Sequence, residues 1–320
     1  MELVLLLPWL LGAGLLALIF DNDSGSGSGS GGSGGTNLTS GNDSNLGTNG
    51  DDLISGLGGD DSLSGGLGDD VLIGGADSDS LNGGSGNDVL VGDDGTGVVN
   101  PTDGRDVMQG GTGDDILIGD NGQDGLFGQD GNDIMFGGFG ADNVFGANGD
   151  DLAVGHRGED TVRGGLGNDI VSGNMLYQGL MTAAEAQTLQ NDGLANDPSN
   201  ITRLGALSQR DDLVADRVLG DAGDDDLYIG DADIASGGIG ADEFFVSPQS
   251  GTNIASEITD FEPGIDEVVV QFAAGAAAPT ITLGADGSGN AQVIANGTVV
   301  ATLNGQAGAV ALTDIRVEPV

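Results

Sequence analysis

Residues Gly65 to Ile73 read Gly-Gly-Leu-Gly-Asp-Asp-Val-Leu-Ile, and residues Gly164 to Ser172 read Gly-Gly-Leu-Gly-Asn-Asp-Ile-Val-Ser. Between Gly47 and Ser172 the chain holds 14 such blocks of nine residues without a slip of register. Position one is Gly in 13 blocks, position four is Gly in 13, position six is Asp in 13, and position eight is apolar in all 14. Low-complexity drift does not keep four positions in phase over 126 residues, so this period decides the fold.

Each position of the block has a physical reason. Gly adopts positive φ easily, so positions one and four permit a tight turn with backbone carbonyls directed inward. Positions seven to nine are typical of a short strand with one inward residue. Two blocks then make one coil of turn, strand, turn and strand. Stacked coils predict an all-β fold, a right-handed parallel β-roll of nine-residue repeats with two repeats per coil.

The Asp at position six places a carboxylate beside those inward carbonyls. Hard oxygen ligands at this density suit calcium, which takes about six to eight oxygens in irregular geometry, better than magnesium, which demands a near-octahedral site. We therefore expect several Ca²⁺ ions between the turns of neighbouring coils.

The block resembles the nonapeptide of the RTX (repeats-in-toxin, haemolysin-type) calcium-binding family, over residues 38–172 and in degenerate form over about 220–272. The resemblance implies a calcium-binding β-roll whose position-six aspartates are the metal ligands. The block with Gly97 at position six departs from the pattern. The implied ligands are Asp43, Asp52, Asp61, Asp70, Asp79, Asp88, Asp106, Asp115, Asp124, Asp133, Asp142, Asp151, Asp160, Asp169, Asp225 and Asp242.

Charge and composition narrow the function classes. The chain has 51 acidic residues against 7 basic ones, a net charge of -44, and no Cys. Nucleic-acid binding, disulfide staples and thiolate metal sites are thereby excluded. Carboxylates in successive turns repel one another, so we expect the repeats to be disordered without calcium and to fold as it binds.

The N-terminal end is hydrophobic. Leu3 to Phe20 are 18 uncharged, mostly apolar residues, and as a helix they would span about 27 Å, slightly less than a bilayer core. Three interpretations fit residues 1–20: an uncleaved membrane anchor, an atypical signal peptide, or an interaction segment. A Gly/Ser-rich linker, residues 21–37, follows and separates this segment from the roll.

An insertion, residues 173–218, interrupts the repeat. Within it, Met181 to Gln190 is predicted to be a short helix, with Thr182 and Glu185 as a capping box. The insertion either lies over the roll or binds a partner.

Degenerate repeats and the end of the roll occupy residues 219–272, where Ile258 to Asp266 is similar to the element that closes many RTX rolls. Residues 273–320 are expected to form a C-terminal β cap, and the resemblance implies a type I secretion signal there. The predicted cap strands are Thr280–Leu283, Ala291–Ala295, Thr298–Leu303 and Ile315–Val317, with Asn296-Gly297 as a hairpin turn. The sequence leaves the export route open.

Catalytic motifs are missing from the sequence. It has neither a zinc-protease H-E-x-x-H nor a G-x-S-x-G elbow, and the single His, His156, is expected to be a solvent-exposed turn residue. We therefore expect no enzyme activity.

The strand faces suggest where a partner could bind. If position eight points inward, positions seven and nine point outward, and large apolar patches commonly mark interfaces. One outer face should carry Ile116, Ile118, Ile134, Phe136, Leu152, Val154 and Ile170, and the opposite face Val71, Ile73, Val89, Val91, Phe127 and Phe145. Either the insertion or the cap covers one face, or the chain self-associates or docks a protein partner there.

Two functions follow from these observations. The first is a calcium-binding repeat protein, extracellular or at the cell surface, that serves as a structural, adhesion or assembly module. The second is a secreted accessory or regulatory RTX protein related to a hydrolase, with an activity that the sequence does not display.

Overall fold

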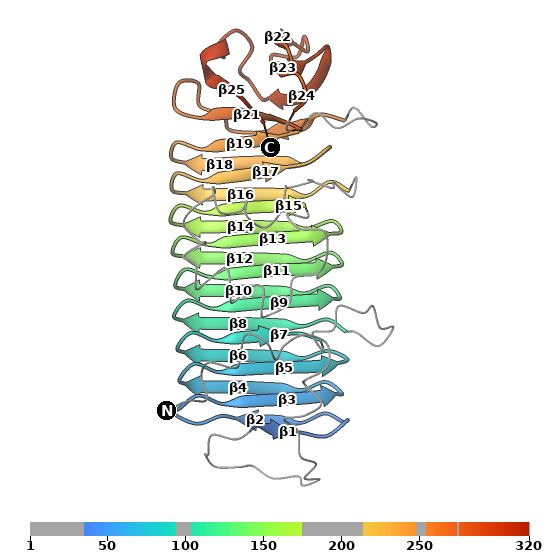
Figure 1. The fold of residues 1–320 in the computed structure, drawn as a ribbon, viewed down its shortest axis with the longest axis vertical. Coiled ribbons are helices and arrows are strands. Elements are labelled where there is room, and N and C mark those ends of the chain that lie inside the picture. Colours follow the sequence, from blue (N-terminus) through green and yellow to red (C-terminus); the bar gives the residue numbers. More distant parts are fainter. Residues whose placement is uncertain (1–34, 94–103, 175–213, 248–253, 274, 320) are drawn as a thin grey trace.

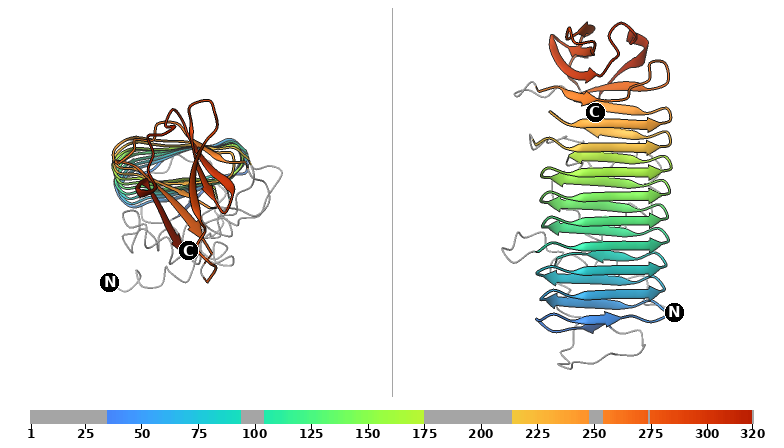
Figure 2. Two further views of the ribbon diagram at one scale, coloured as in Figure 1. Left: turned by 90° about the horizontal axis from the view of Figure 1, so that it is seen from above. Right: turned by 180° about the vertical axis from the view of Figure 1, so that it is seen from behind.

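The molecule is a column of stacked coils, with the first repeats at one end and a β cap at the other (Figure 1). This computed structural model describes residues 35–93, 104–174, 214–247, 254–273 and 275–319. Seen from above, the column is a flattened oval with a layer of strands on each long side (Figure 2). The hydrophobic segment Leu3–Phe20 and the predicted helix Met181–Gln190 lie outside the described residues.

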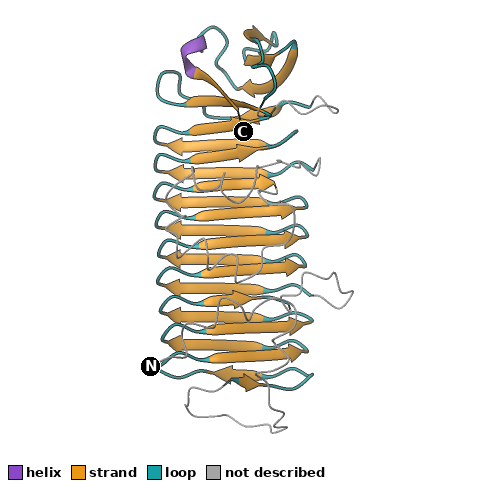
Figure 3. Ribbon diagram, viewed as in Figure 1, coloured by secondary structure: helices purple, strands orange, loops and turns teal. Residues whose placement is uncertain are grey.

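Almost every described element is a strand (Figure 3). The strands of the roll are β1 (Thr36–Asn37), β2 (Ser44–Leu46), β3 (Leu53–Gly58), β4 (Ser62–Leu67), β5 (Val71–Ala76), β6 (Ser80–Ser85), β7 (Val89–Val91), β8 (Val107–Thr112), β9 (Ile116–Asn121), β10 (Gly125–Asp130), β11 (Ile134–Phe139), β12 (Asn143–Asn148), β13 (Leu152–Arg157), β14 (Thr161–Leu166), β15 (Ile170–Asn174), β16 (Arg217–Ala222), β17 (Asp226–Ile229), β18 (Ile234–Ile239), β19 (Glu243–Val246), β20 (Ser256–Ile258) and β21 (Glu267–Phe272). The cap holds β22 (Ile281–Ala285), β23 (Ala291–Ala295), β24 (Thr298–Leu303), the 3-10 helix η4 (Leu312–Asp314) and β25 (Ile315–Pro319).

Two parallel sheets form the long sides of the roll. The first sheet runs β1-β3-β5-β7-β9-β11-β13-β15-β17-β19-β21-β25, and the second runs β2-β4-β6-β8-β10-β12-β14-β16-β18-β20-β24-β23-β22. Leu53 pairs with Val71 and Ile134 pairs with Leu152, so a regular coil contains two nine-residue blocks. The predicted all-β parallel roll is therefore confirmed.

The core is a stack of position-eight side chains between the two sheets. Each is at most 2% exposed, because each strand directs its central residue into the narrow interior. They are Ile54, Leu63, Leu72, Leu81, Leu90, Met108, Leu117, Leu126, Met135, Val144, Ala153, Val162 and Val171. The inward position predicted from the period is correct.

One block changes the side on which later strands lie. In chain order β7 is followed, among the described strands, by β8, which begins at Val107, 18 residues after Val89 rather than nine. β7 lies on the first sheet and β8 on the second, although strict alternation over two blocks would return β8 to the first sheet. The strands from β8 to β15 therefore lie on the sheet opposite to the one that strict alternation predicts. The prediction that Val71, Ile73, Val89 and Val91 lie opposite Ile116 is therefore wrong. All of them are on the first sheet, and Phe127 and Phe145 remain on the second.

The outward side chains of the first sheet are covered, which was one of the two alternatives left open by the sequence. Ile116 and Ile134 are 0% exposed, and Phe136 is 3% exposed. They belong to a second hydrophobic cluster that continues along the same face to Tyr228, Phe245 and Val269. This apolar face is buried and does not offer a free surface.

The expectation for His156 was wrong as well. His156 lies near the end of β13 and is 2% exposed, with its ring centroid 5.6 Å from that of Phe136. Burial lowers the pKa of His156 to about 4, because the buried site disfavours the charged imidazolium.

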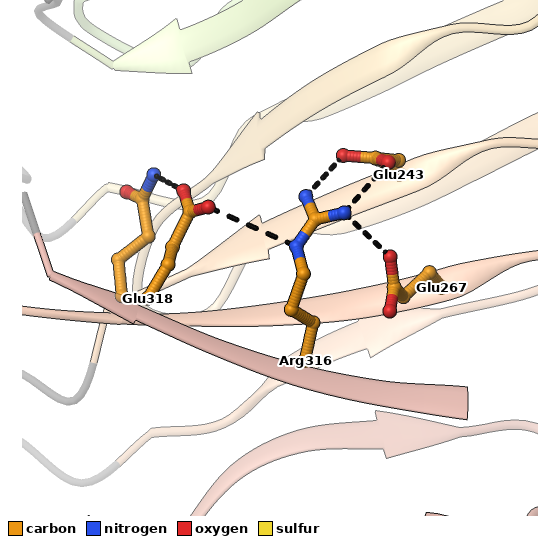
Figure 4. Close-up of polar contacts among 5 residues, drawn as sticks. Glu243, Glu267, Arg316 and Glu318 are labelled. Carbon is orange, nitrogen blue, oxygen red and sulfur yellow. Dashed lines mark hydrogen bonds and ion pairs between the residues drawn. The ribbon is translucent and has the colours of Figure 1, made fainter. Parts of the chain in front are cut away.

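The cap closes the last coil. The predicted strands are confirmed, and Asn296 and Gly297 form the two-residue turn between β23 and β24 with φ of 50° and 90°. β25 pairs in parallel with β21, as the last strand of the first sheet. Arg316 binds Glu243 and Glu267 at 2.5 Å and 2.7 Å and lies 3.7 Å from Glu318, which ties β19, β21 and β25 together (Figure 4).

The inward stack gives a first prediction. Leu117→Ala should lower the free energy of unfolding by about 2–5 kcal/mol, because it leaves a cavity in a fully buried layer. Urea unfolding followed by circular dichroism measures the change. Gln109→Ala is the matched control, because Gln109 is exposed on the outer face of the second sheet and its truncation should change stability little. Equal effects of the two substitutions would contradict this account of the core.

Candidate metal centre

Position-six aspartates form two ladders that run along the column, one at each turn edge. In each ladder the backbone N–H of one Asp donates to Oδ1 of the Asp in the next coil, as Asp115 does to Asp133 at 2.8 Å. The Asp43 ladder contains Asp43, Asp61, Asp79, Asp106, Asp124, Asp142, Asp160, Asp216 and Asp233. The Asp52 ladder contains Asp52, Asp70, Asp88, Asp115, Asp133, Asp151, Asp169, Asp225, Asp242 and Asp266. All 16 aspartates predicted as ligands are thereby brought into two rows.

The second oxygen of these carboxylates is the unusual feature. In twelve of them Oδ2 is buried and has no hydrogen-bond partner, although a buried carboxylate oxygen ordinarily has one. These twelve are Asp61, Asp70, Asp79, Asp88, Asp115, Asp124, Asp133, Asp142, Asp151, Asp169, Asp225 and Asp242. An acceptor left in this way needs a donor or a cation to offset its burial.

Glycine at position one makes the space for that oxygen. A Cβ placed on Gly137 would lie 2.6 Å from Oδ2 of Asp142 and 2.7 Å from the carbonyl oxygen of Gly155 in the next coil. A carboxylate oxygen and a backbone carbonyl therefore converge where a side chain would otherwise be. This cradle fits a hard cation that takes oxygen ligands.

The ligand set is rich in backbone atoms. Among the described residues no three acidic or imidazole side chains converge as a metal cluster. An ion in these cradles would therefore be held by single carboxylates together with main-chain carbonyls, which suits the irregular oxygen coordination of calcium.

Burial makes the charged form of the ladder carboxylates unfavourable. Burial raises the pKa of Asp115 to about 8, and it raises the pKa of Asp124 and of Asp151 to about 9. Neighbouring ladder carboxylates add to the shift, as Asp133 does for Asp115. The N–H donors lower these values but do not offset the desolvation. The charged form is disfavoured in the absence of a cation.

A second row of Asp and Asn lies at position five, on the outer side of the Asp52 edge. Here the direction is reversed, because the N–H of Asp69 donates back to Oδ1 of Asp51 in the preceding coil. The same bond recurs from Asn87 to Asp69, Asp114 to Asn87, Asn132 to Asp114, Asp150 to Asn132, Asn168 to Asp150 and Asp224 to Asn168. Adjacent acids in one turn therefore bond to opposite neighbours, an arrangement that the sequence analysis missed.

The sequence analysis also missed three ladder residues. Asp216 stands nine residues before Asp225, so carrying the period backward would have found it. Asp233 follows Asp225 by only eight residues, so it falls one residue out of register with the nine-residue repeat. Asp266 is the last residue of the closing element Ile258–Asp266, where the repeat is no longer recognisable.

Comparison with known proteins supports the chemistry of these rows. The family model described as the RTX calcium-binding nonapeptide repeat matches four times, at residues 38–72, 64–99, 101–135 and 136–171. No curated protein matches the sequence of the chain.

The cradle predicts a strong effect of a single methyl group. We call each ladder aspartate, with the turn that carries it, a rung. Gly137→Ala should disrupt the rung of Asp142, because the added Cβ would meet Oδ2 of Asp142 and the Gly155 carbonyl well inside van der Waals contact. We expect weaker calcium binding and a lower unfolding midpoint in calcium. Gly50→Ala is the control, since a Cβ there meets nothing within 4 Å. If both variants behave alike, the cradle is not a binding site.

The raised pKa values predict an unusual pH dependence without calcium. A carboxyl whose folded pKa lies above its unfolded value of about 3.8 stabilises the fold at low pH, and this contribution is lost as pH rises through the folded value. In EDTA, strand content measured by circular dichroism should therefore be higher near pH 5 than near pH 9. His156 opposes this trend, because its lowered pKa destabilises the fold at low pH. It is a single group, however, against two rows of carboxylates. In saturating calcium the trend should reverse, because protons displace the ion. Identical profiles with and without calcium would contradict the assignment.

Proposed function

We propose that the chain, whose residues 38–171 match the RTX calcium-binding nonapeptide repeat, is an extracellular calcium-binding module that folds as it binds calcium. Ca²⁺ is the cofactor of this repeat family. The proposed ligands are the ladder aspartates with Gly-lined cradles, from Asp61 in one ladder and Asp70 in the other.

One observation carries this proposal: twelve buried carboxylate oxygens have no hydrogen-bond partner, and nine of them converge with a backbone carbonyl of a neighbouring coil. Successive ladder carboxylates are separated by about the strand spacing of ~4.8 Å. At an effective dielectric of ~20, two such charges repel by about 3.5 kcal/mol. A divalent ion between coils turns this repulsion into attraction, so binding and folding are coupled.

The setting that we propose is outside the cell or at its surface. Extracellular calcium modules bind with dissociation constants of roughly 0.1–1 mM, which keeps them empty where calcium is scarce. The acidic chain would then remain unfolded before export and fold outside. A C-terminal type I secretion signal within residues 273–320 is part of this proposal.

The role we propose there is structural, in adhesion or assembly, and not catalytic. The single imidazole of the chain, His156, is buried against Phe136, so it is not available to a substrate. A long rigid column with regularly spaced surface rows instead suits a spacer or scaffold.

Docking of a second copy or a protein partner is proposed on the second sheet. Its outer face carries Phe127 and Phe145, which stack with ring centroids 5.5 Å apart and are partly exposed, next to exposed Gln109 and Arg163. The corresponding apolar residues of the first sheet are buried.

Membrane anchoring through Leu3–Phe20 stays a proposal about residues outside the described ranges. Within the described ranges no helix is long and apolar enough to cross a bilayer.

Calcium titration tests the proposed ligands. Isothermal calorimetry should show multiple ions per chain, with a parallel gain of strand signal in circular dichroism. Asp133→Asn should remove at least one ion, because an amide N–H₂ replaces the oxygen that faces the cradle. Asp150→Asn should leave the number unchanged, since the position-five row already contains Asn132 and Asn168 at equivalent places. No calcium uptake by the native chain would refute the proposal.

A further inference from the structure

Each ladder ends, in both directions, at a carboxylate that the chain itself satisfies. At the first coil, the Thr39 N–H and Oγ1–H donate to Oδ2 of Asp43 at 2.8 Å and 2.6 Å. The Thr48 N–H and Oγ1–H donate to Oδ2 of Asp52 at 2.6 Å and 2.9 Å. These bonds use Oδ2, the oxygen that has no hydrogen-bond partner in the twelve carboxylates described above.

The C-terminal ends of the ladders repeat this arrangement with backbone donors alone. The Gly230 N–H donates to Oδ2 of Asp233 at 2.7 Å. The Glu262 N–H donates to Oδ2 of Asp266 at 2.6 Å. In three of the four ends the donor precedes the Asp by four residues, which is position two of the block.

Position two has a different backbone conformation in the internal rungs. We call the twelve carboxylates whose Oδ2 has no hydrogen-bond partner open. The residues four positions before them all have φ between 68° and 131°. They are Leu57, Gly66, Gly75, Gly84, Gly111, Asp120, Gln129, Gly138, Ala147, Gly165, Asp221 and Gly238. Thr39, Thr48, Gly230 and Glu262 are described residues, and none of them has a positive φ.

Position one differs as well at three of the ends. Leu38 stands five residues before Asp43, Phe261 five before Asp266, and Ile229 four before Asp233, whereas all twelve carboxylates without a partner have Gly five residues earlier. Ile229 and Phe261 are buried in the core, and Leu38 packs against it. Their side chains occupy the interior beside the turn, so these blocks lack the Gly cradle. Asp52 keeps its cradle, since a Cβ on Gly47 would lie 2.8 Å from its Oδ2.

We infer that the backbone at position two decides which rungs hold calcium. A left-handed residue turns its N–H away from the Asp four residues later and leaves Oδ2 to an ion. A residue with negative φ donates to that oxygen and closes the rung. Asp43, Asp52, Asp233 and Asp266 are then ion-free stops that end the two ladders without exposing an uncompensated carboxylate. This inference rests on the proposed function.

The inference gives a reason for the non-glycine residues with positive φ. Leu57, Gln129 and Ala147 adopt a conformation that disfavours side chains with a Cβ. Such strain persists where function requires it. Here the conformation keeps the position-two N–H from competing with the cation.

The first test frees Oδ2 of Asp52 from its Thr48 donors, so that the rung can take an ion. In Thr48→Gly the hydroxyl donor is lost and the residue can become left-handed, while the Gly47 cradle is already present. Calorimetry and metal analysis after equilibrium dialysis should show one more calcium ion per chain than in the native protein. Thr39→Gly is the matched control, because Leu38 fills position one there and the number of ions should not change.

The second test gives Oδ2 of Asp61 a hydrogen-bond donor in place of an ion. Leu57→Thr recreates before Asp61 the Thr-x-x-x-Asp spacing of the two N-terminal ends, and a β-branched residue disfavours positive φ. One ion per chain should be lost. Leu57→Gly, which keeps the left-handed conformation accessible, should bind the native number.

The outcomes separate this inference from the proposed function. If the native chain binds no calcium, the proposed function fails. If the native chain binds calcium but Thr48→Gly gains no ion, position two does not control the rungs. Circular dichroism in calcium checks that each variant folds. If Leu57→Thr does not fold, the comparison of Thr48→Gly with Thr39→Gly decides alone.

Discussion

The burial of two rows of carboxylates is the constraint on which the rest of the roll depends. Each carboxylate accepts an N–H from the preceding coil through Oδ1, which sets the stacking of the coils. In twelve of these carboxylates the other oxygen is buried without a hydrogen-bond donor. Because burial raises the pKa of residues such as Asp124 to about 9, the charged rows need cations at neutral pH. The calcium chemistry of the repeat family meets that need.

The same turns limit how the rest of the coil can be stabilised. Gly at position one gives room to the carboxylate but contributes no side chain to the interior. The interior therefore receives mainly one apolar residue per strand, such as Leu117 or Val144. Where the roll ends, larger residues enter this place, as Ile229 and Phe261 do, and the aspartates there bond to the chain instead. At these two ends a buried apolar side chain therefore replaces the glycine cradle, and the carboxylate is satisfied by a backbone N–H.

Much of the candidate site could be predicted from the repeat. The phase placed all 16 predicted aspartates in the two ladders, because a nine-residue period repeats the same local turn each time. The period did not reveal Asp233 or Asp266, since a shortened block and an irregular closing element bring them into the rows only through coil stacking. It also could not show that Asp43 and Asp52 bond to Thr39 and Thr48, which depends on the backbone conformation of single residues.

The sequence by itself determined the parallel roll, the inward position of each strand and the oxygen chemistry of its turns. These follow from local rules, because glycine, aspartate and apolar residues at fixed spacing repeat one turn and one strand. Only the tertiary structure decided which sheet a strand joins, as the extra block before Val107 moves Ile116 to the side of Val89. It also decided that His156 and the outer face around Ile134 are buried. Sheet membership depends on the total count of half-coils, and burial depends on distant packing, so neither is contained in a nine-residue pattern.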